Sequence, residues 1–82
     1  MKIRDAQIFS DKVVDIIRIE QQRMGISNYT LAQRANLSEA SLSYIYHHKR
    51  RPTLYTLALI ADKLGISLSE IIERAERESN KK

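Results

Sequence analysis

The chain has 82 residues, of which 43% are hydrophobic and 29% charged, and this composition favours one globular domain over a disordered chain. Cysteine is absent, which excludes disulfides and cysteine-ligated metal sites and fits a reducing compartment. No apolar run reaches the roughly 18 residues that a membrane span needs, and the first residues lack the apolar core of a signal peptide. We therefore expect a cytoplasmic protein with no membrane contact.

The positive charge is concentrated in the middle of the chain. The formal net charge is +4, and residues 27–56 hold four basic residues and one acidic residue. The segments before and after them are close to balance. A local basic surplus of this kind suggests a polyanionic partner.

The first predicted helix covers residues 11–24, with Ser10 or Asp11 as its N-cap and Gly25 as its stop. Its apolar stripe consists of Val13, Val14, Ile16, Ile17 and Met24. A short helix from about residue 29 to 35 follows, capped by Ser27 or Asn28. Asn36 interrupts it, because asparagine tolerates left-handed backbone better than most residues.

The remaining helices follow from capping signals. Ser38 caps a helix from about residue 39 to 46 or 47, and the basic block 47–51 with Pro52 forms a loop. Thr53 caps a helix that ends at Gly65 and whose apolar residues (Leu54, Leu57, Ala58, Ile60, Ala61 and Leu64) place it centrally in the core. Ser67 and Glu70 form a capping box for a last helix through about residue 77, with residues 78–82 frayed. The prediction is one all-α domain of five helices over residues 1–82.

Two short helices joined by three or four residues are typical of a helix-turn-helix, here at about residues 27–47. Ala32 is small enough for the close crossing of the helices, and Asn36 can take the turn. The inward face consists of Leu31, Ala35, Leu37, Leu42 and Ile45. The outward face of the second helix is small and mostly polar, whereas a merely solvated helix would more usually carry Lys and Glu.

Residues 21–72 resemble the phage-repressor/Cro-type helix-turn-helix domain, also called the XRE family. The stretches that carry the resemblance are GISNYTLAQRANLSEASLSYI and KRRPTLYTLALIADKLGISLSEII. The resemblance implies a compact five-helix, lambda-repressor-like domain that binds double-stranded DNA, usually as a dimer, with the second motif helix in the major groove. It also implies a sequence-specific transcriptional regulator of bacterial or phage type, acting as a repressor by occupying a promoter.

Carried over by position, the resemblance assigns base reading to Glu39, Ala40, Ser43 and Tyr44. It assigns contacts with the DNA backbone to Asn28, Ser38, His47, Lys49, Arg50 and Arg51. The residue chemistry agrees: a glutamate accepts from the cytosine amino group, an alanine touches the thymine methyl, and basic side chains hold phosphates.

The chain departs from the family pattern after the reading helix. The family has a glutamate, any residue and a glycine where this chain has Tyr46, His47 and His48. The arginine that pairs with that glutamate corresponds to Gln21. We hypothesise a Gln21–Tyr46 contact in place of the ion pair, because losing both charges avoids a stranded buried one. His48 in the glycine position suggests a different loop geometry.

Other functions are less well supported. His47 and His48 are neighbours that point about 100° apart on a helix, with no third ligand near in sequence, so we expect no metal site and no cofactor. Ser41 and Ser43 have no base or oxyanion site, so we expect no enzyme. Nor is any pocket for a small-molecule effector evident. The alternative interpretation is a helical protein-interaction module or an antitoxin-type partner protein with weak or no DNA binding.

Several apolar and aromatic residues could form contacts at the surface. The last helix carries Ile66, Leu68, Ile71, Ile72 and Ala75, and those left exposed predict a homodimer through the C-terminal helix, with Ile3, Ile8 and Phe9 docking beside it. Tyr29 could either reach DNA or pack beside Tyr55.

Overall fold

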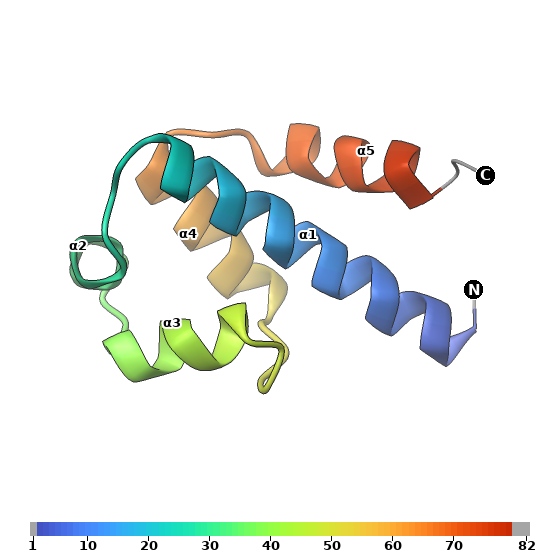
Figure 1. Ribbon diagram of the computed structural model, residues 1–82, viewed down its shortest axis with the longest axis horizontal. Helices are drawn as coiled ribbons and strands as arrows, with labels where there is room; N and C mark the ends of the chain where they lie inside the picture. Colours follow the sequence, from blue (N-terminus) through green and yellow to red (C-terminus); the bar gives the residue numbers. More distant parts are fainter. Residues whose placement is uncertain (1, 80–82) are drawn as a thin grey trace.

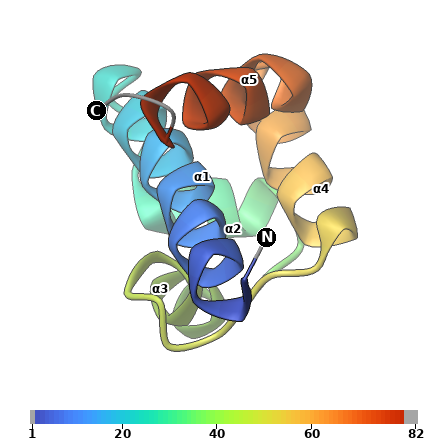
Figure 2. The same cartoon turned by 90° about the vertical axis from the view of Figure 1, so that its right-hand side faces the viewer.

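The computed structural model describes residues 2–79 and folds them into five helices (Figure 1). They are α1 (Ile3–Arg23), α2 (Asn28–Arg34), α3 (Glu39–Tyr46), α4 (Leu54–Leu64) and α5 (Leu68–Ser79). This part of the chain contains no strand, so the predicted all-α class and the five helices are confirmed. α1 runs through the length of the molecule, with α5 along one side of it and α3 on the other (Figures 1 and 2).

α1 begins about two turns earlier than predicted. It starts at Ile3, so Ser10 and Asp11 lie inside the helix and the prediction that one of them caps it is wrong. Residues 3–10 contain no glycine or proline, and once a helix has nucleated each further residue adds a hydrogen bond, so the helix extends upstream. Lys2 is the N-cap and makes no side-chain capping bond. Met24, expected on the apolar stripe, is the C-cap and is exposed.

The other helix starts follow the predicted capping residues. Ser27, Ser38 and Thr53 are the N-caps of α2, α3 and α4. Each accepts a hydrogen bond from the backbone N–H three residues later, at 3.0 to 3.1 Å. Such caps contribute about 1 kcal/mol each. Ser67 accepts a longer bond of 3.4 Å from the Glu70 N–H before α5.

The end of α5 lies further along the chain than predicted. The helix continues to Ser79, so Glu78 and Ser79 are helical and not frayed. The rest of the predicted frayed tail, residues 80–82, lies outside the described residues.

Every helix contributes one face to a single hydrophobic core. Its most deeply buried large side chains are Val14, Ile17, Leu31, Leu42 and Ile60. α4 packs into this core as predicted, but Leu54 and Ala58 of its apolar set face solvent. The reason is the 3.6-residue period, which turns part of an almost wholly apolar helix away from the core.

A buried carboxylate joins α5 to α1. Glu20 of α1 is 9% exposed and its Oε2 lies 3.1 Å from Arg23 Nη2 and 3.3 Å from Arg74 Nη1 of α5. Burying a carboxylate is costly unless it is paired, and the two guanidinium groups meet that requirement. α3 and the loop after it pack against the opposite side of α1 (Figure 1). Over residues 2–79 no helix combines the length and the apolar character that crossing a bilayer demands.

Candidate nucleic-acid interface

α2 and α3 form the predicted helix-turn-helix. Ala32, placed by the sequence at the close crossing, is buried. Asn36 has a φ of 55°, the left-handed conformation predicted for it. The Leu37 N–H donates to the Ala32 carbonyl at 2.8 Å and the Asn36 N–H donates to the Gln33 carbonyl at 3.2 Å. This is the Schellman pattern that closes a helix, and it fixes the direction in which the chain enters α3.

α3 has a buried face and an exposed face. Leu42 and Ile45 are buried, as their spacing predicted, and Tyr46 is buried too. The other face carries the four predicted base-reading residues: Glu39, Ala40 and Tyr44 are exposed and Ser43 is half-buried. α3 lies at the surface of the molecule on the side away from α5 (Figure 1). This face is therefore accessible, small and polar, with one aromatic ring.

The loop after α3 begins with a left-handed histidine. His48 has a φ of 60°. Its N–H donates to the Ile45 carbonyl at 3.1 Å, and the Lys49 N–H donates to the Tyr44 carbonyl at 2.8 Å, which is again the Schellman pattern. His48 thus adopts the left-handed backbone conformation that favours glycine, which is the family residue at this position. Histidine is one of the non-glycine residues enriched in this region.

α1 holds the His48 ring from both sides. Nδ1 lies 3.3 Å from an Asp11 oxygen and Nε2 lies 3.0 Å from an Asp15 oxygen. Arg51 Nη1 also approaches Asp11, at 3.8 Å. Sequence reasoning missed the role of these two aspartates, and the only signal was their four-residue spacing on one helix face. The contacts fasten the start of the loop to α1 and turn Arg51 towards it.

The three basic side chains of the loop lie in different surroundings. The Arg50 guanidinium lies 5.4 Å from the centre of the Tyr44 ring, within cation–π range, and its Nη1 donates to Ser41 Oγ at 3.2 Å. Arg50 therefore extends along the exposed face of α3, whereas Arg51 turns back to Asp11. Lys49 is exposed between them. The basic block is thus divided between α3, solvent and α1.

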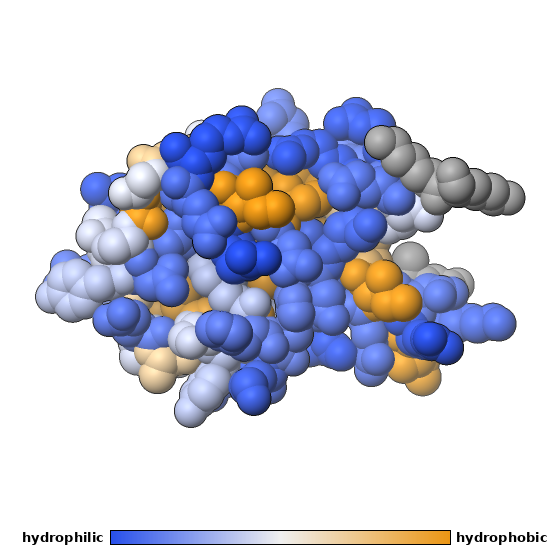
Figure 3. Space-filling view, viewed as in Figure 1, coloured by the Kyte–Doolittle hydropathy of each residue, from blue (hydrophilic) through white to orange (hydrophobic). Residues whose placement is uncertain are grey.

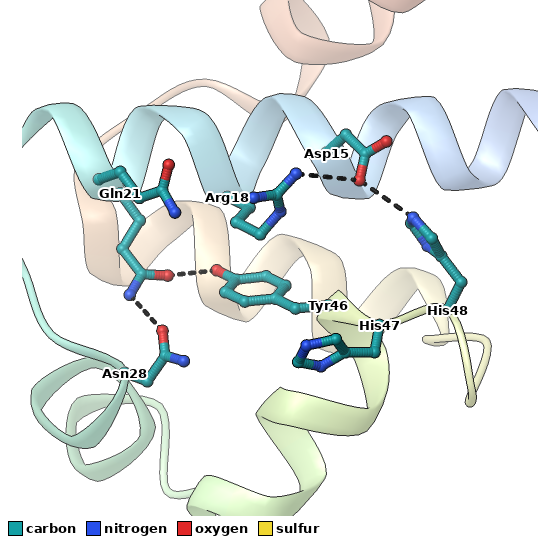
Figure 4. Close-up of a pocket in the computed structure, with 8 residues that line it drawn as sticks. Asp15, Arg18, Gln21, Asn28, Tyr46, His47 and His48 are labelled. Carbon is teal, nitrogen blue, oxygen red and sulfur yellow. Dashed lines mark hydrogen bonds and ion pairs between the residues drawn. The ribbon is translucent and has the colours of Figure 1, made fainter.

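The hypothesised Gln21–Tyr46 contact is present. The Tyr46 hydroxyl donates to Gln21 Oε1 at 2.5 Å, and both residues are buried (Figure 4). Burial raises the pKa of Tyr46 to about 12, although the positive charge of Arg18 acts in the opposite direction. Gln21 Nε2 donates onward to Asn28 Oδ1 at 2.7 Å and to the Ile26 carbonyl at 2.9 Å. A continuous chain of neutral groups therefore runs from α3 through α1 to the first residue of α2.

His47 and Ser38 are two of the residues predicted to contact the DNA backbone, and both make hydrogen bonds to residues of α3. His47 Nδ1 lies 2.8 Å from the Ser43 carbonyl, and since a carbonyl only accepts, Nδ1 carries the hydrogen. His47 Nε2 can therefore donate to a phosphate only in the imidazolium form. The Ser38 hydroxyl accepts from the Ser41 N–H and donates to Ser41 Oγ at 2.8 Å. A phosphate near Ser38 would then meet the backbone N–H groups at the start of α3.

The two adjacent histidines diverge. His48 turns to α1, while His47 lies back over α3 (Figure 4). Within residues 2–79 no three His, Asp or Glu side chains gather as metal ligands would. Tyr29 is exposed and its hydroxyl accepts from Gln33 Nε2 at 2.9 Å, so its ring is open to solvent beside the start of α2.

The family model of the Cro/C1-type helix-turn-helix DNA-binding domain matches residues 17–76. The chain belongs to this family. The matched region runs from the middle of α1 into α5 and includes the helix-turn-helix and the basic loop. Comparisons with curated proteins and with solved structures gave no match.

Proposed function

We propose that this Cro/C1-type domain is a sequence-specific transcriptional regulator that represses by occupying a promoter. The observation that carries the proposal is the exposed face of α3, which is narrow and polar and is flanked by a cationic loop. A helix with small side chains can enter the major groove of B-DNA, which is about 12 Å wide. The family membership supports DNA as the partner.

The proposed roles divide the residues into two groups. Glu39, Ala40, Ser43 and Tyr44 face the base edges. The residues that face the DNA backbone are Asn28, Ser38, His47, Lys49, Arg50 and Arg51. Base-facing residues would set sequence preference, while backbone contacts would set affinity and register.

Salt dependence tests whether the domain binds DNA through phosphates. If about four phosphates are neutralised per subunit, log K should fall with log[salt] at a slope of about −4 for a half-site and about −7 for a dimer. Fluorescence anisotropy of a labelled duplex over a salt series measures this slope. A weak, salt-insensitive interaction with every duplex would instead support the rival protein-interaction module.

Substitution tests the division of roles. Lys49→Ala should weaken all DNA sequences about equally and make the salt slope shallower by about one. Glu39→Ala should alter base preference, by about 1–3 kcal/mol where the contact is bidentate. Lys63→Ala is the matched control, because Lys63 is an exposed lysine in the last turn of α4 and belongs neither to the helix-turn-helix nor to the basic loop. If Lys49→Ala and Glu39→Ala change preference alike, the division is wrong.

Selection of bound sites from a random DNA pool identifies the operator. The expected result is a near-palindromic site with two half-sites about one helical turn apart. Placing that site over a reporter promoter then tests repression, because bound protein should lower transcription from it. An enriched pool without any common sequence would contradict sequence-specific reading.

We propose that the domain acts as a homodimer through a seam made by α5 and the start of α1. α5 buries Ile71 and Ala75 in the core of its own subunit. The large exposed apolar side chains of the proposed seam therefore come from α1, where Ile3 is 81% and Ile8 52% exposed. The residues that line a groove beside them are Asp5, Ile8, Phe9, Lys12, Glu78 and Ser79. Figure 3 shows apolar surface at this same end of the molecule.

The position of the seam suits a two-fold complex. The start of α1 lies at one end of the molecule, to the side of α3 (Figure 1). A two-fold axis there, running parallel to the direction in which α3 faces, would keep both α3 helices on one side of the dimer. Ile8→Asp should therefore give monomers in sedimentation equilibrium, whereas Tyr55→Asp, at an exposed apolar side chain near the end of α2, should not. A wild-type chain that stays monomeric on its full operator would contradict the seam.

A further inference from the structure

Asn28 is an exposed side chain held from inside the protein. It opens α2, where the proposed function has it meet a DNA phosphate, and its Oδ1 accepts from Gln21 Nε2 at 2.7 Å. Gln21 is only 3% exposed and Tyr46, which donates to it, is only 6% exposed. The orientation of a surface amide is thus linked to two buried groups on other helices.

The Ile26 carbonyl fixes the donor and the acceptor of each hydrogen bond that links Tyr46, Gln21 and Asn28. A carbonyl only accepts, so the Gln21 atom that lies 2.9 Å from it must be the amide nitrogen. A reversed Gln21 amide would set its oxygen against two other acceptors, the Ile26 carbonyl and Asn28 Oδ1. Gln21 Oε1 therefore faces α3, and the Tyr46 hydroxyl has to be the donor to it.

The same reasoning orients Asn28. Because Gln21 Nε2 donates to it, the Asn28 atom facing the protein is Oδ1, and the Nδ2 hydrogens point elsewhere. Figure 4 shows Nδ2 turned away from Gln21 towards an open pocket that Arg18, Gln22 and His47 also line. A free asparagine amide has two broadly similar orientations about its last torsion, and one of them would present oxygen to a phosphate. Fixing the amide beforehand removes that unfavourable orientation and the cost of ordering it on binding.

We propose that Gln21 and Tyr46 are positioning residues that hold the Asn28 amide with its Nδ2 hydrogens towards a DNA phosphate. The proposal rests on the proposed DNA-binding function and adds two residues that touch no DNA themselves. It predicts that Gln21 acts on DNA binding through Asn28 and through no other residue.

A double-mutant cycle with Gln21→Met and Asn28→Ala tests this prediction. Methionine has a similar size to glutamine and no amide, so it preserves packing while releasing Asn28. We expect Asn28→Ala to weaken duplex binding about tenfold, since a hydrogen bond to a charged group is lost. Gln21→Met should approach the same loss when Asn28 is present, and should change affinity less than about twofold in the Asn28→Ala background. The two changes together should then weaken binding no more than Asn28→Ala alone.

A control cycle with Lys49→Ala separates this effect from general loosening. Gln21→Met and Lys49→Ala should multiply, because Lys49 makes no contact with Gln21 among the described residues. A full Gln21→Met loss in the Asn28→Ala background would overturn the positioning role, as would normal binding by Asn28→Ala. Failure of the wild-type protein to bind duplex DNA would instead contradict the proposed function itself.

A measurement on the wild-type protein covers the case in which Gln21→Met does not fold. In a ¹⁵N-correlated NMR spectrum, the Asn28 side-chain amide should give two distinct hydrogens of restricted mobility. Those signals should shift when duplex DNA is added, while the Gln21 amide should stay protected from solvent exchange. An Asn28 amide that is mobile in the free protein, or unmoved by bound DNA, would overturn the proposal.

Discussion

Replacing Tyr46 with phenylalanine should lower stability at neutral pH. The Tyr46 hydroxyl donates to Gln21 Oε1, and both side chains are buried. Phenylalanine keeps the ring in the core but leaves that oxygen without its donor. A buried polar atom that loses its partner costs about 1–3 kcal/mol, so we expect the free energy of unfolding at pH 8 to fall by about this amount.

The same substitution should remove part of the alkaline sensitivity of the fold. Burial raises the pKa of Tyr46 to about 12 from its ordinary value of 10.0. The unfolded chain therefore releases the proton first, and the stability present below pH 10 is lost as the pH rises towards 12. At pH 11 the linkage amounts to about 1.4 kcal/mol without screening, and we expect about 1 kcal/mol after it. Phenylalanine has no proton to release.

Urea unfolding followed by circular dichroism between pH 8 and pH 11 measures both effects. The gap in unfolding free energy between wild type and Tyr46→Phe should narrow by about 1 kcal/mol over this range. Tyr55→Phe is the control, because the Tyr55 ring is exposed and its loss should leave the wild-type pH dependence in place. If wild type and Tyr46→Phe lose stability in parallel up to pH 11, the assigned burial of the hydroxyl is wrong.

Three further substitutions test α3 and the loop after it. His48→Ala should be about 1 kcal/mol less stable than His48→Gly in thermal unfolding, because only glycine adopts left-handed backbone without strain; equal stabilities would contradict strain at this residue. Leu42→Ala should cost about 2–5 kcal/mol in urea unfolding, since the side chain is fully buried, and a loss below about 1 kcal/mol would mean that α3 packs loosely. Ser38→Ala should cost about 1 kcal/mol and speed amide exchange in the first turn of α3, whereas unchanged exchange would argue against the cap.

Features that depend on neighbouring residues could be predicted from the sequence. Ser27, Ser38 and Thr53 cap helices because a short polar side chain reaches the backbone N–H three residues on, and Asn36 turns left-handed for similarly local reasons. The start of α1 could not be predicted in this way. A cap residue at position 10 signals a helix start only if the preceding residues are not already helical, and residues 3–9 are.

The exposed face of α3 was also predictable, because helical periodicity alone separates Leu42 and Ile45 from the outward residues. The surroundings of the loop were not. His48 meets Asp11 and Asp15, which lie more than 30 residues earlier in the chain, and nothing local indicates that contact. For the same reason the sequence gives no distinction between Arg50 and Arg51, although Arg50 lies over the Tyr44 ring of α3 and Arg51 turns to α1.

The neutral Gln21–Tyr46 pair and the family's ion pair join α1 to the end of α3 by different physics. A buried ion pair must offset the desolvation of two charges, and losing one partner costs about 3–5 kcal/mol. The neutral pair carries no charge to desolvate, but it is directional, since the Tyr46 hydroxyl must donate and the Gln21 amide must accept on one side and donate on the other. That direction continues into Asn28. The neutral pair therefore also fixes the orientation of a surface amide, and in the proposed function that amide faces a DNA phosphate.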